Sequence, residues 1–155
     1  METLAVLLAA VLVGIAGLHL AWGCGLRWPG EDERTLIDAV IGRPDVHRMP
    51  GLGLCLVVTL ALLAAAFWAL WAAGWVAVPD GSVVGLSVRE IGLWLLVAVF
   101  LGRGAATYLP GPLSGAVEPF RTLDRRLYAP LCLALGVGFL VLLSVGLSVE
   151  IDSAP

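Results

Sequence analysis

Four long apolar runs, separated by segments that hold most of the charge, constrain this chain more than any other feature. The runs cover residues 3–22, 52–78, 89–108 and 127–149. A helix needs about 20 mostly apolar residues to cross the hydrocarbon core of a bilayer. The third run is the weakest of the four, because Arg103 interrupts it. The pattern predicts an all-α polytopic membrane protein, with four transmembrane helices forming one bundle domain over residues 1–155.

The composition agrees with a lipid environment and excludes several functional classes. Hydrophobic residues make up 60% of the chain and charged residues 14%, against about 45–50% and about 25% in soluble domains. The excess of apolar residues excludes a soluble globular enzyme and a disordered chain. The nine basic residues, all arginine, are outnumbered by twelve acidic ones, so no basic surface for nucleic acid is expected.

The arginines predict how the chain is oriented. Eight of the nine lie in or beside the first and third loops: Arg27, Arg34, Arg43, Arg48, Arg103, Arg121, Arg125 and Arg126. Basic residues near transmembrane ends stay on the cytoplasmic side. We therefore expect a multi-pass protein of the inner (plasma) membrane with both termini on the non-cytoplasmic side. Met1-Glu2-Thr3 offers no basic segment, so the first run is expected to remain a helix rather than be cleaved as a signal peptide.

The first cytoplasmic loop contains a helical pattern of its own. From Glu31 to Ile41, acidic residues come first and apolar residues then recur at helical spacing, until Gly42 and Pro44 end the pattern. This predicts a short amphipathic helix that lies on the cytoplasmic membrane interface.

Small residues recur at four-residue spacing within three of the runs. The stripes are Ala10 with Gly14, Ala61 with Ala65, Ala69 and Ala73, and Ala134 with Gly138. Such stripes let helices approach closely inside lipid. The same pattern suits contacts within the bundle or between copies of the chain, and the sequence leaves both open.

Five side chains are expected at similar depth near the cytoplasmic ends of the helices. They are His19, Trp22, Arg103, Asp124 and Tyr128. Arg103 lies 12 residues after Ile91, or about 18 Å along a helix, which places it inside or at the edge of a hydrocarbon core about 30 Å thick.

An ionisable group at that depth is a functional-site hypothesis by default, and it is usually paired. Asp124 is the nearest candidate partner for Arg103. One alternative is that Arg103 only extends to the interface or joins the third helix to the fourth. His19 has two interpretations as well: a proton carrier or ligand contact, or a core histidine bonded to a backbone carbonyl or to Tyr128.

Pro130 adds a backbone feature beside this cluster. Proline has no N–H, so within a helix it leaves a carbonyl one turn earlier, near Arg126, without its usual donor. We expect the fourth helix to bend there and to offer this carbonyl to a partner.

Two segments resemble a known family. His19, Trp22, Gly25 and Trp28 fit the element H-x-x-W-x-x-G-x-x-W, and residues 120–132 fit F-x-x-L-D-x-x-L-Y-x-P-L-C, with Arg103-Gly104 upstream. These elements resemble the DUF3995 family of small bacterial integral membrane proteins. The resemblance implies a four-helix fold and no particular reaction.

The residues favour a binding function over catalysis. We expect a cytoplasm-facing pocket in which His19, Trp22, Arg103, Asp124 and Tyr128 hold a lipid headgroup or a small amphipathic ligand. The alternatives are an accessory subunit of a larger membrane complex, with a membrane-protein partner or a homo-oligomer, and an intramembrane enzyme acting on a lipophilic substrate. No catalytic motif, metal-ligand spacing or cofactor motif is recognisable, so no catalytic residue, cofactor or metal is predicted.

Overall fold

The computed structural model describes residues 1–77, 79, 81–83, 86–109 and 116–153, and these are almost entirely helical. The long helices are α1 (Glu2–Gly23), α3 (Leu52–Ala72), α4 (Val88–Ala106) and α6 (Ala129–Ser153). Shorter elements are α2 (Glu33–Val40), α5 (Phe120–Leu123) and the π-helical turn η1 (Asp124–Tyr128). Strands β1 (Ser82–Val83) and β2 (Leu86–Ser87) form one short antiparallel pair. The predicted all-α class is confirmed.

Three helical stretches of the described chain are long and apolar enough to cross a membrane. They are Glu2–Gly23, Leu52–Ala72 and Phe120–Gly146. Helix α4 has 19 residues and carries Arg89, Glu90 and Arg103, so it is less apolar than the other three. Length and composition therefore support a membrane protein.

Two of the four predicted helical ranges differ from the structure by more than two residues at an end. Helix α3 ends at Ala72 rather than at residue 78, because Gly74 adopts φ +81° and the N–H of Trp75 turns back to the carbonyl of Leu70. Glycine readily takes this left-handed conformation, which commonly ends helices. The last helical stretch begins at Phe120, before the predicted start at residue 127, because α5 and η1 run directly into α6.

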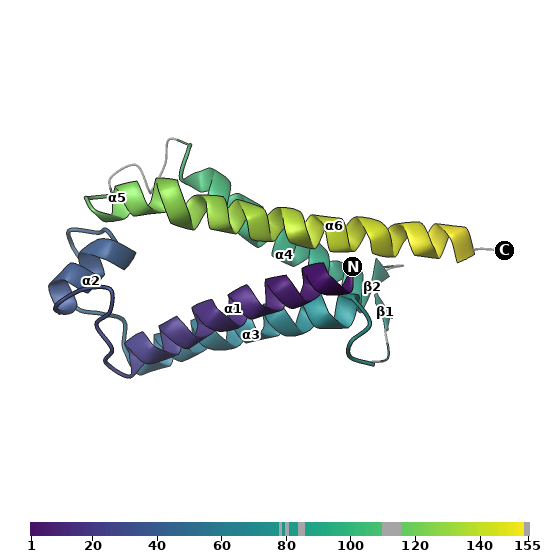
Figure 1. The fold of residues 1–155 in the computed structure, drawn as a ribbon, viewed down its shortest axis with the longest axis horizontal. Helices are drawn as coiled ribbons and strands as arrows, with labels where there is room; N and C mark the ends of the chain where they lie inside the picture. Colours follow the sequence, from purple (N-terminus) through teal and green to yellow (C-terminus); the bar gives the residue numbers. More distant parts are fainter. Residues whose placement is uncertain (78, 80, 84–85, 110–115, 154–155) are drawn as a thin grey trace.

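The long helices associate as two pairs. Helix α1 packs along α3, and α4 packs along α6 (Figure 1). The hydroxyl of Thr59 on α3 donates hydrogen bonds to the carbonyls of Cys55 and Ala16, and the second bond links α3 to α1. The two pairs meet near the N-terminus of α1 and separate toward the opposite end, where α2 and α5 lie (Figure 1).

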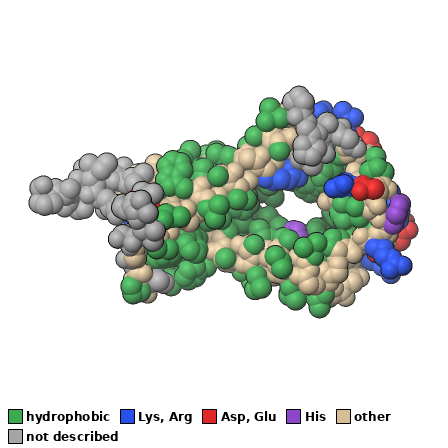
Figure 2. Space-filling view, turned by 180° about the vertical axis from the view of Figure 1, so that it is seen from behind, with side chains coloured by type: hydrophobic (Ala, Val, Ile, Leu, Met, Phe, Trp, Pro, Cys, Tyr) green, Lys and Arg blue, Asp and Glu red, His purple; other side chains and the backbone are tan. Residues whose placement is uncertain are grey.

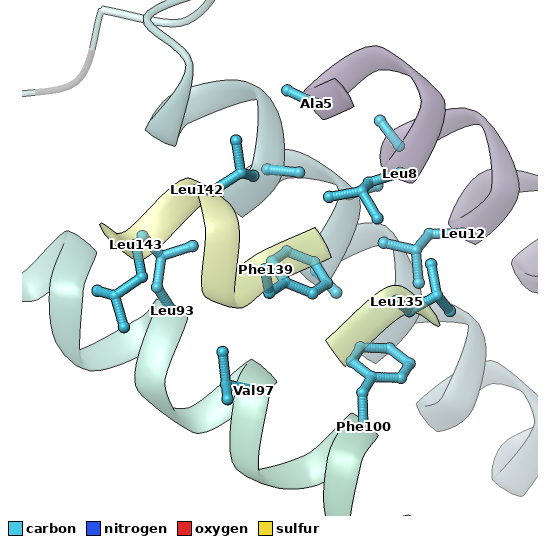
Figure 3. Close-up of a cluster of buried hydrophobic side chains, with 14 residues drawn as sticks. Ala5, Leu8, Leu12, Leu93, Val97, Phe100, Leu135, Phe139, Leu142 and Leu143 are labelled. Carbon is cyan, nitrogen blue, oxygen red and sulfur yellow. The ribbon is translucent and has the colours of Figure 1, made fainter. Parts of the chain in front are cut away.

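The shared core occupies only the end where the pairs meet. There Phe139 of α6 is fully buried between α1 and α4 (Figure 3). Its ring stacks on Phe100 with centroids 5.7 Å apart. Leu8 and Leu12 contribute from α1, and Leu93, Val97 and other residues complete the cluster. Among the described residues, this cluster is confined to the end where the pairs meet.

Part of the small-residue set packs inside the bundle, and for the exposed members a contact between copies of the chain stays a prediction. Ala65 and Ala69 are buried in the core, and Gly138 lies against Leu8. Ala10, Gly14 and Ala134 are exposed. On α1 the buried small residues are instead Ala5, Ala9 and Ala16, which share a face with Leu8 and Leu12. The face of α1 that turns inward is therefore the one with Leu8 and Leu12 and not the one with Ala10 and Gly14.

Two glycines on α4 provide a matched test of the α4–α6 contact. A Cβ at Gly104 would lie 2.6 Å from Leu133 and 3.0 Å from the carbonyl oxygen of Ala129, whereas Gly102 has open space around it. We expect Gly104→Leu to lower the free energy of unfolding by about 1–3 kcal/mol through overpacking. Gly102→Leu is the control and should behave like wild type. Equal stability of the two variants in a denaturant titration in detergent would contradict this packing.

The predicted amphipathic helix is present as α2, and its apolar face is covered by protein. The carboxylate of Asp32 caps the helix by accepting hydrogen bonds from the N–H and the hydroxyl of Thr35. These two hydrogen bonds hold the pKa of Asp32 below its usual value. Leu36 and Ile37 are fully buried. Their burial shows that the apolar face of α2 packs on protein, and its position at the membrane interface stays a prediction.

Candidate ligand site at the open end of the bundle

The separation of the two helix pairs leaves a visible opening. Figure 2 shows the molecule hollowed near its α2 end, with a basic side chain and a histidine beside the opening. The surrounding surface is mainly apolar, and most other charged side chains on this face lie farther out toward the α2 end (Figure 2). A basic and an imidazole side chain thus lie beside an opening whose surroundings are mainly hydrophobic.

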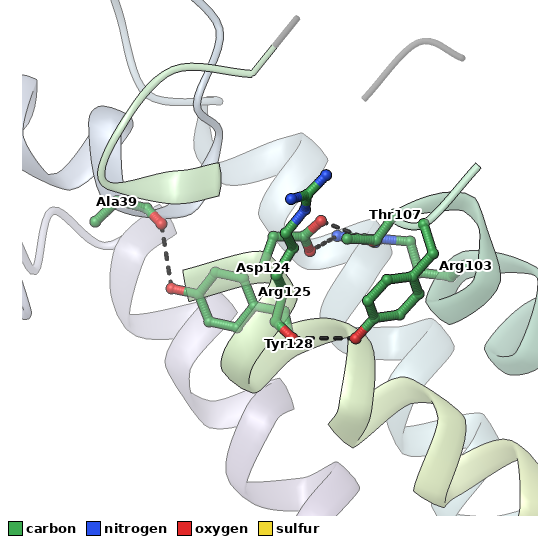
Figure 4. A network of polar contacts seen from close by, with 7 residues as sticks. Ala39, Arg103, Thr107, Asp124, Arg125 and Tyr128 are labelled. Atoms are coloured by element: carbon green, nitrogen blue, oxygen red, sulfur yellow. Dashed lines mark hydrogen bonds and ion pairs between the residues drawn. The ribbon is translucent and has the colours of Figure 1, made fainter. Parts of the chain in front are cut away.

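Arg103 and Asp124 form an ion pair between α4 and η1. The Nη2 atom of Arg103 lies 2.6 Å from Oδ1 of Asp124 (Figure 4). Thr107 completes the network: its hydroxyl donates to Oδ2 of Asp124 over 2.7 Å and accepts from Nη1 of Arg103 over 3.0 Å. The prediction that Asp124 is the partner of Arg103 is confirmed.

The two charges differ in exposure. The Asp124 side chain is 3% exposed, and the Arg103 side chain is 37% exposed. Both oxygens of Asp124 accept a hydrogen bond, so this buried carboxylate is satisfied within the protein. Arg103 has five N–H donors, and its bonds to Asp124 and Thr107 fix the guanidinium while one side stays accessible. The arrangement presents a positioned cationic donor at the open end.

Thr107 is the member of this network that the sequence reasoning missed. It lies four residues after Arg103, a spacing that places both on one helix face. Threonine is common in apolar helices and signals nothing alone. Only the pairing of Arg103 with a buried acid would have drawn attention to a hydroxyl one turn away.

The backbone before Pro130 is π-helical, and the predicted bend stays a prediction. The helix widens into η1, where the N–H of Ala129 donates to the carbonyl of Asp124, five residues earlier. Such π-helical turns often occur at functional sites. A nearby carbonyl does gain a partner from another element, because the Tyr108 hydroxyl donates to the carbonyl of Arg125 over 3.0 Å (Figure 4). A carbonyl one turn before Pro130 thus binds a partner from another element, as predicted, but it is the carbonyl of Arg125 rather than that of Arg126.

Tyr128 joins η1 to α2 rather than to His19. Its hydroxyl donates to the carbonyl of Ala39 over 3.1 Å (Figure 4). Its ring lies against that of Phe120, with centroids 5.9 Å apart. Next to this contact, the N–H of Val117 donates to the carbonyl of Gly42. Tyr128 therefore helps to hold α2 across the open end.

We expect Tyr128→Phe to loosen α2 without disturbing the ring contact with Phe120. The lost hydrogen bond to Ala39 should cost about 0.5–1.5 kcal/mol. Hydrogen exchange of the backbone amides in residues 33–40 should become faster. Tyr108→Phe is the control, since it loses a comparable bond to an exposed carbonyl and should leave α2 unchanged. Identical exchange in both variants would contradict the role assigned to Tyr128.

His19 and Trp22 form a second group on α1. The Nδ1 atom of His19 lies 2.9 Å from the carbonyl oxygen of Ile15. A carbonyl only accepts, so Nδ1 is the donor in this contact, and in the tautomer that carries its proton on Nδ1 the Nε2 atom can accept. The Trp22 ring lies 5.1 Å from the imidazole, and its Nε1 donates to the carbonyl of Trp28. Of the two structural interpretations of His19, the bond to a backbone carbonyl is confirmed.

These two residues line a pocket of about 170 Å³. Its other walls come from α2, α3 and the segment between them: Val40, Ile41, Met49, Pro50, Leu54, Cys55 and Val58. The pocket is almost wholly apolar, so the imidazole is its main polar group. The five predicted site residues thus fall into two groups, one on α1 and one on α4 and η1, both at the open end.

The structure offers little for a metal. Cys55 is buried, Cys132 is half-buried and Cys24 is exposed. Within the part of the chain that the structure describes, no group of three histidine, cysteine or acidic side chains is arranged to hold a metal ion.

Comparison with known proteins agrees with the resemblance of the two sequence elements. No curated protein and no solved structure matches the chain. A family model described as "Protein of unknown function (DUF3995)" matches residues 12–139, which include all five predicted site residues. This match covers most of the chain, and the protein belongs to the DUF3995 family.

Proposed function

We propose that this protein is a four-span membrane protein that binds an amphipathic ligand at the open end of its bundle, with the polar head of the ligand at Arg103. The observation that carries the proposal is the opening between the helix pairs, together with a guanidinium that a buried carboxylate holds in place (Figure 2). A site that is concave, mostly apolar and supplied with a few fixed polar groups is typical of small-molecule binding.

The charges favour a ligand with a phosphate or carboxylate head. Asp124 uses both of its oxygens on Arg103 and Thr107, so it orients the guanidinium rather than meeting the ligand. Arginine binds planar anionic groups through its remaining donors. On the opposite helix pair, Trp22 and the Nε2 atom of His19 would contact the neck of the ligand. Tyr128 would act indirectly, by holding α2 across the end of the site.

The same ion pair supports α4 as the fourth span. A charged side chain is costly inside a membrane unless it is paired. Arg103 is paired within the bundle, Arg89 lies in the first turn of α4 near the membrane surface, and the buried Glu90 beside it accepts the N–H of Ser87. Four spans place both termini on one side, and the arginine distribution places them outside the cytoplasm.

Cys24 allows this orientation to be tested, because its thiol is exposed just after α1. In a variant with Cys55→Ala and Cys132→Ala, a membrane-impermeant maleimide should label Cys24 only when the cytoplasmic face is accessible, as in inverted vesicles. Labelling from the outer face of intact cells would contradict the orientation.

The binding site can be tested by thermal stability in mild detergent with defined lipids. A ligand that binds only the folded protein at about 100 times its Kd should raise Tm by about 5–10 °C. We expect phosphatidic acid to produce this shift and phosphatidylcholine with the same chains to produce little. Arg103→Gln with Asp124→Asn should abolish the shift, since it removes the fixed cation and also leaves no unpaired charge.

Arg126→Gln is the matched control, because Arg126 is an exposed arginine on η1, the element that also carries Asp124. It should keep the response to phosphatidic acid. A shift that survives in the double variant, or that is lost equally in Arg126→Gln, would show that general attraction to anionic lipid explains the effect and would overturn the site.

A further inference from the structure

A long apolar groove lies between α3 and α4, where these helices face each other without packing closely. It has a volume of about 510 Å³, within the range of about 300–1,000 Å³ that is typical of ligand sites. On α3 the small residues Ala61, Ala64 and Ala65 leave room for the groove. On α4 it is lined by Leu95, Leu96, Val99 and Phe100. The groove belongs to neither of the two close helix pairs.

One end of the groove is closed. Trp68 donates its Nε1 hydrogen to the carbonyl of Arg89, across from α3 to α4. Gly92 makes room for this indole, since a Cβ at that position would overlap Trp68. The groove is therefore capped at the end away from the candidate site, which distinguishes it from an ordinary lipid-facing furrow that continues along the bundle.

The other end leads to the polar groups. Gly92, Leu96, Val99 and Arg103 are spaced four, three and four residues apart, so they lie along one face of α4. The distance from Gly92 to Arg103 along the helix axis is about 16 Å. On α3, Val58 lines both this groove and the pocket that contains His19 and Trp22. The groove therefore points along α4 toward Arg103, and it shares the wall residue Val58 with the pocket that contains His19 and Trp22.

We infer that the α3–α4 groove holds the hydrocarbon chain of the ligand whose anionic head lies at Arg103, so that the ligand is a long-chain lipid. The chain would run along α4 with its methyl end toward Trp68. This inference rests on the proposed function and adds the class of ligand and the place of its tail. The head is a carboxylate or a phosphate, which corresponds to a free fatty acid or to a phospholipid of the bilayer.

Photo-crosslinking with two probes tests the inference. The probes are a fatty acid and a phosphatidic acid, each with a diazirine in the middle of its chain, added to the full-length protein in nanodiscs. We expect the crosslinks to concentrate in residues 57–65 and 95–100. Labelling by the fatty acid alone would identify the carboxylate source, and labelling by phosphatidic acid would identify the phosphate source. Either result supports the inference.

Ala61→Phe fills the groove from an exposed position and should reduce this labelling by about ten-fold, because the added ring occupies the space of the chain. Ala98→Phe is the control, since Ala98 is exposed on α4 and does not line the groove. A second filling variant, Ala64→Phe, guards against a local effect of the first, and both should keep the wild-type elution profile in detergent.

The outcomes separate this inference from the proposed function. If Ala61→Phe and Ala64→Phe label like wild type while Arg103→Gln with Asp124→Asn loses labelling, the head site stands and the tail site is wrong. If none of the variants changes labelling, both are wrong. Crosslinks spread evenly over the lipid-facing helices would indicate surrounding bilayer lipid only and would also overturn the inference.

Discussion

Arg103→Ala is expected to lower the free energy of unfolding by about 3–5 kcal/mol, because it leaves a buried carboxylate without its counter-ion. Asp124 is 3% exposed and receives its only described cationic contact from Arg103. Thr107 alone would remain as a donor to Asp124. Titration with a denaturing detergent, read by circular dichroism, measures the loss.

The double variant Arg103→Gln with Asp124→Asn separates lost charge pairing from lost hydrogen bonding. Replacing both members of a buried pair by neutral groups is far less costly than removing one of them. We expect this variant to recover most of the stability that Arg103→Ala loses. Arg126→Ala should be close to wild type, since Arg126 is exposed. If Arg103→Ala proves as stable as Arg126→Ala, the pair does not contribute as described.

Gly42→Val should detach α2 from α5, and it is the second large effect that we expect. Gly42 has φ +66°, and a Cβ there would overlap the ring of Phe120. A β-branched residue adds backbone strain of about 1–3 kcal/mol and an overpacking cost of about 1–3 kcal/mol. Hydrogen exchange of residues 33–40 should rise strongly, because the carbonyl of Gly42 also accepts the N–H of Val117.

Gly25→Val distinguishes the two causes of this effect. Gly25 has φ +97°, but nothing lies within 4 Å of a Cβ at that position. This variant should therefore suffer only the backbone strain, with its effect confined to the turn after α1. If both variants leave the exchange of α2 unchanged, the contact between Gly42 and Phe120 does not secure α2.

The helices of this fold could be predicted from hydropathy, whereas their partners could not. Runs of apolar residues set the positions of α1, α3, α4 and α6 closely, and Gly74 explains why α3 ends early. Which face of each helix turns inward depends on packing. Ala10 and Gly14 have the favoured spacing and are exposed, because the opposite face of α1, with Leu8 and Leu12, packs into the core.

The candidate site was predicted in part for a similar reason. Depth along the helices brought Arg103 and Asp124 together, since a charge inside a bundle needs a partner. Depth alone could not predict that His19 and Tyr128 lie in different groups, because it says nothing about the distance between the two helix pairs. The bond from Tyr128 to Ala39 depends on where a loop helix folds back, and no residue pattern encodes that position.

The central claim is that the open end of the bundle holds a lipid at Arg103, and native mass spectrometry tests it most directly. The protein would be released from nanodiscs formed with its own membrane, wild type beside Arg103→Gln with Asp124→Asn. We predict one bound lipid with an anionic head per wild-type chain and loss of that lipid in the variant. A wild-type protein that carries no lipid, carries the same lipid as the variant, or carries only a stoichiometric protein partner would contradict the account.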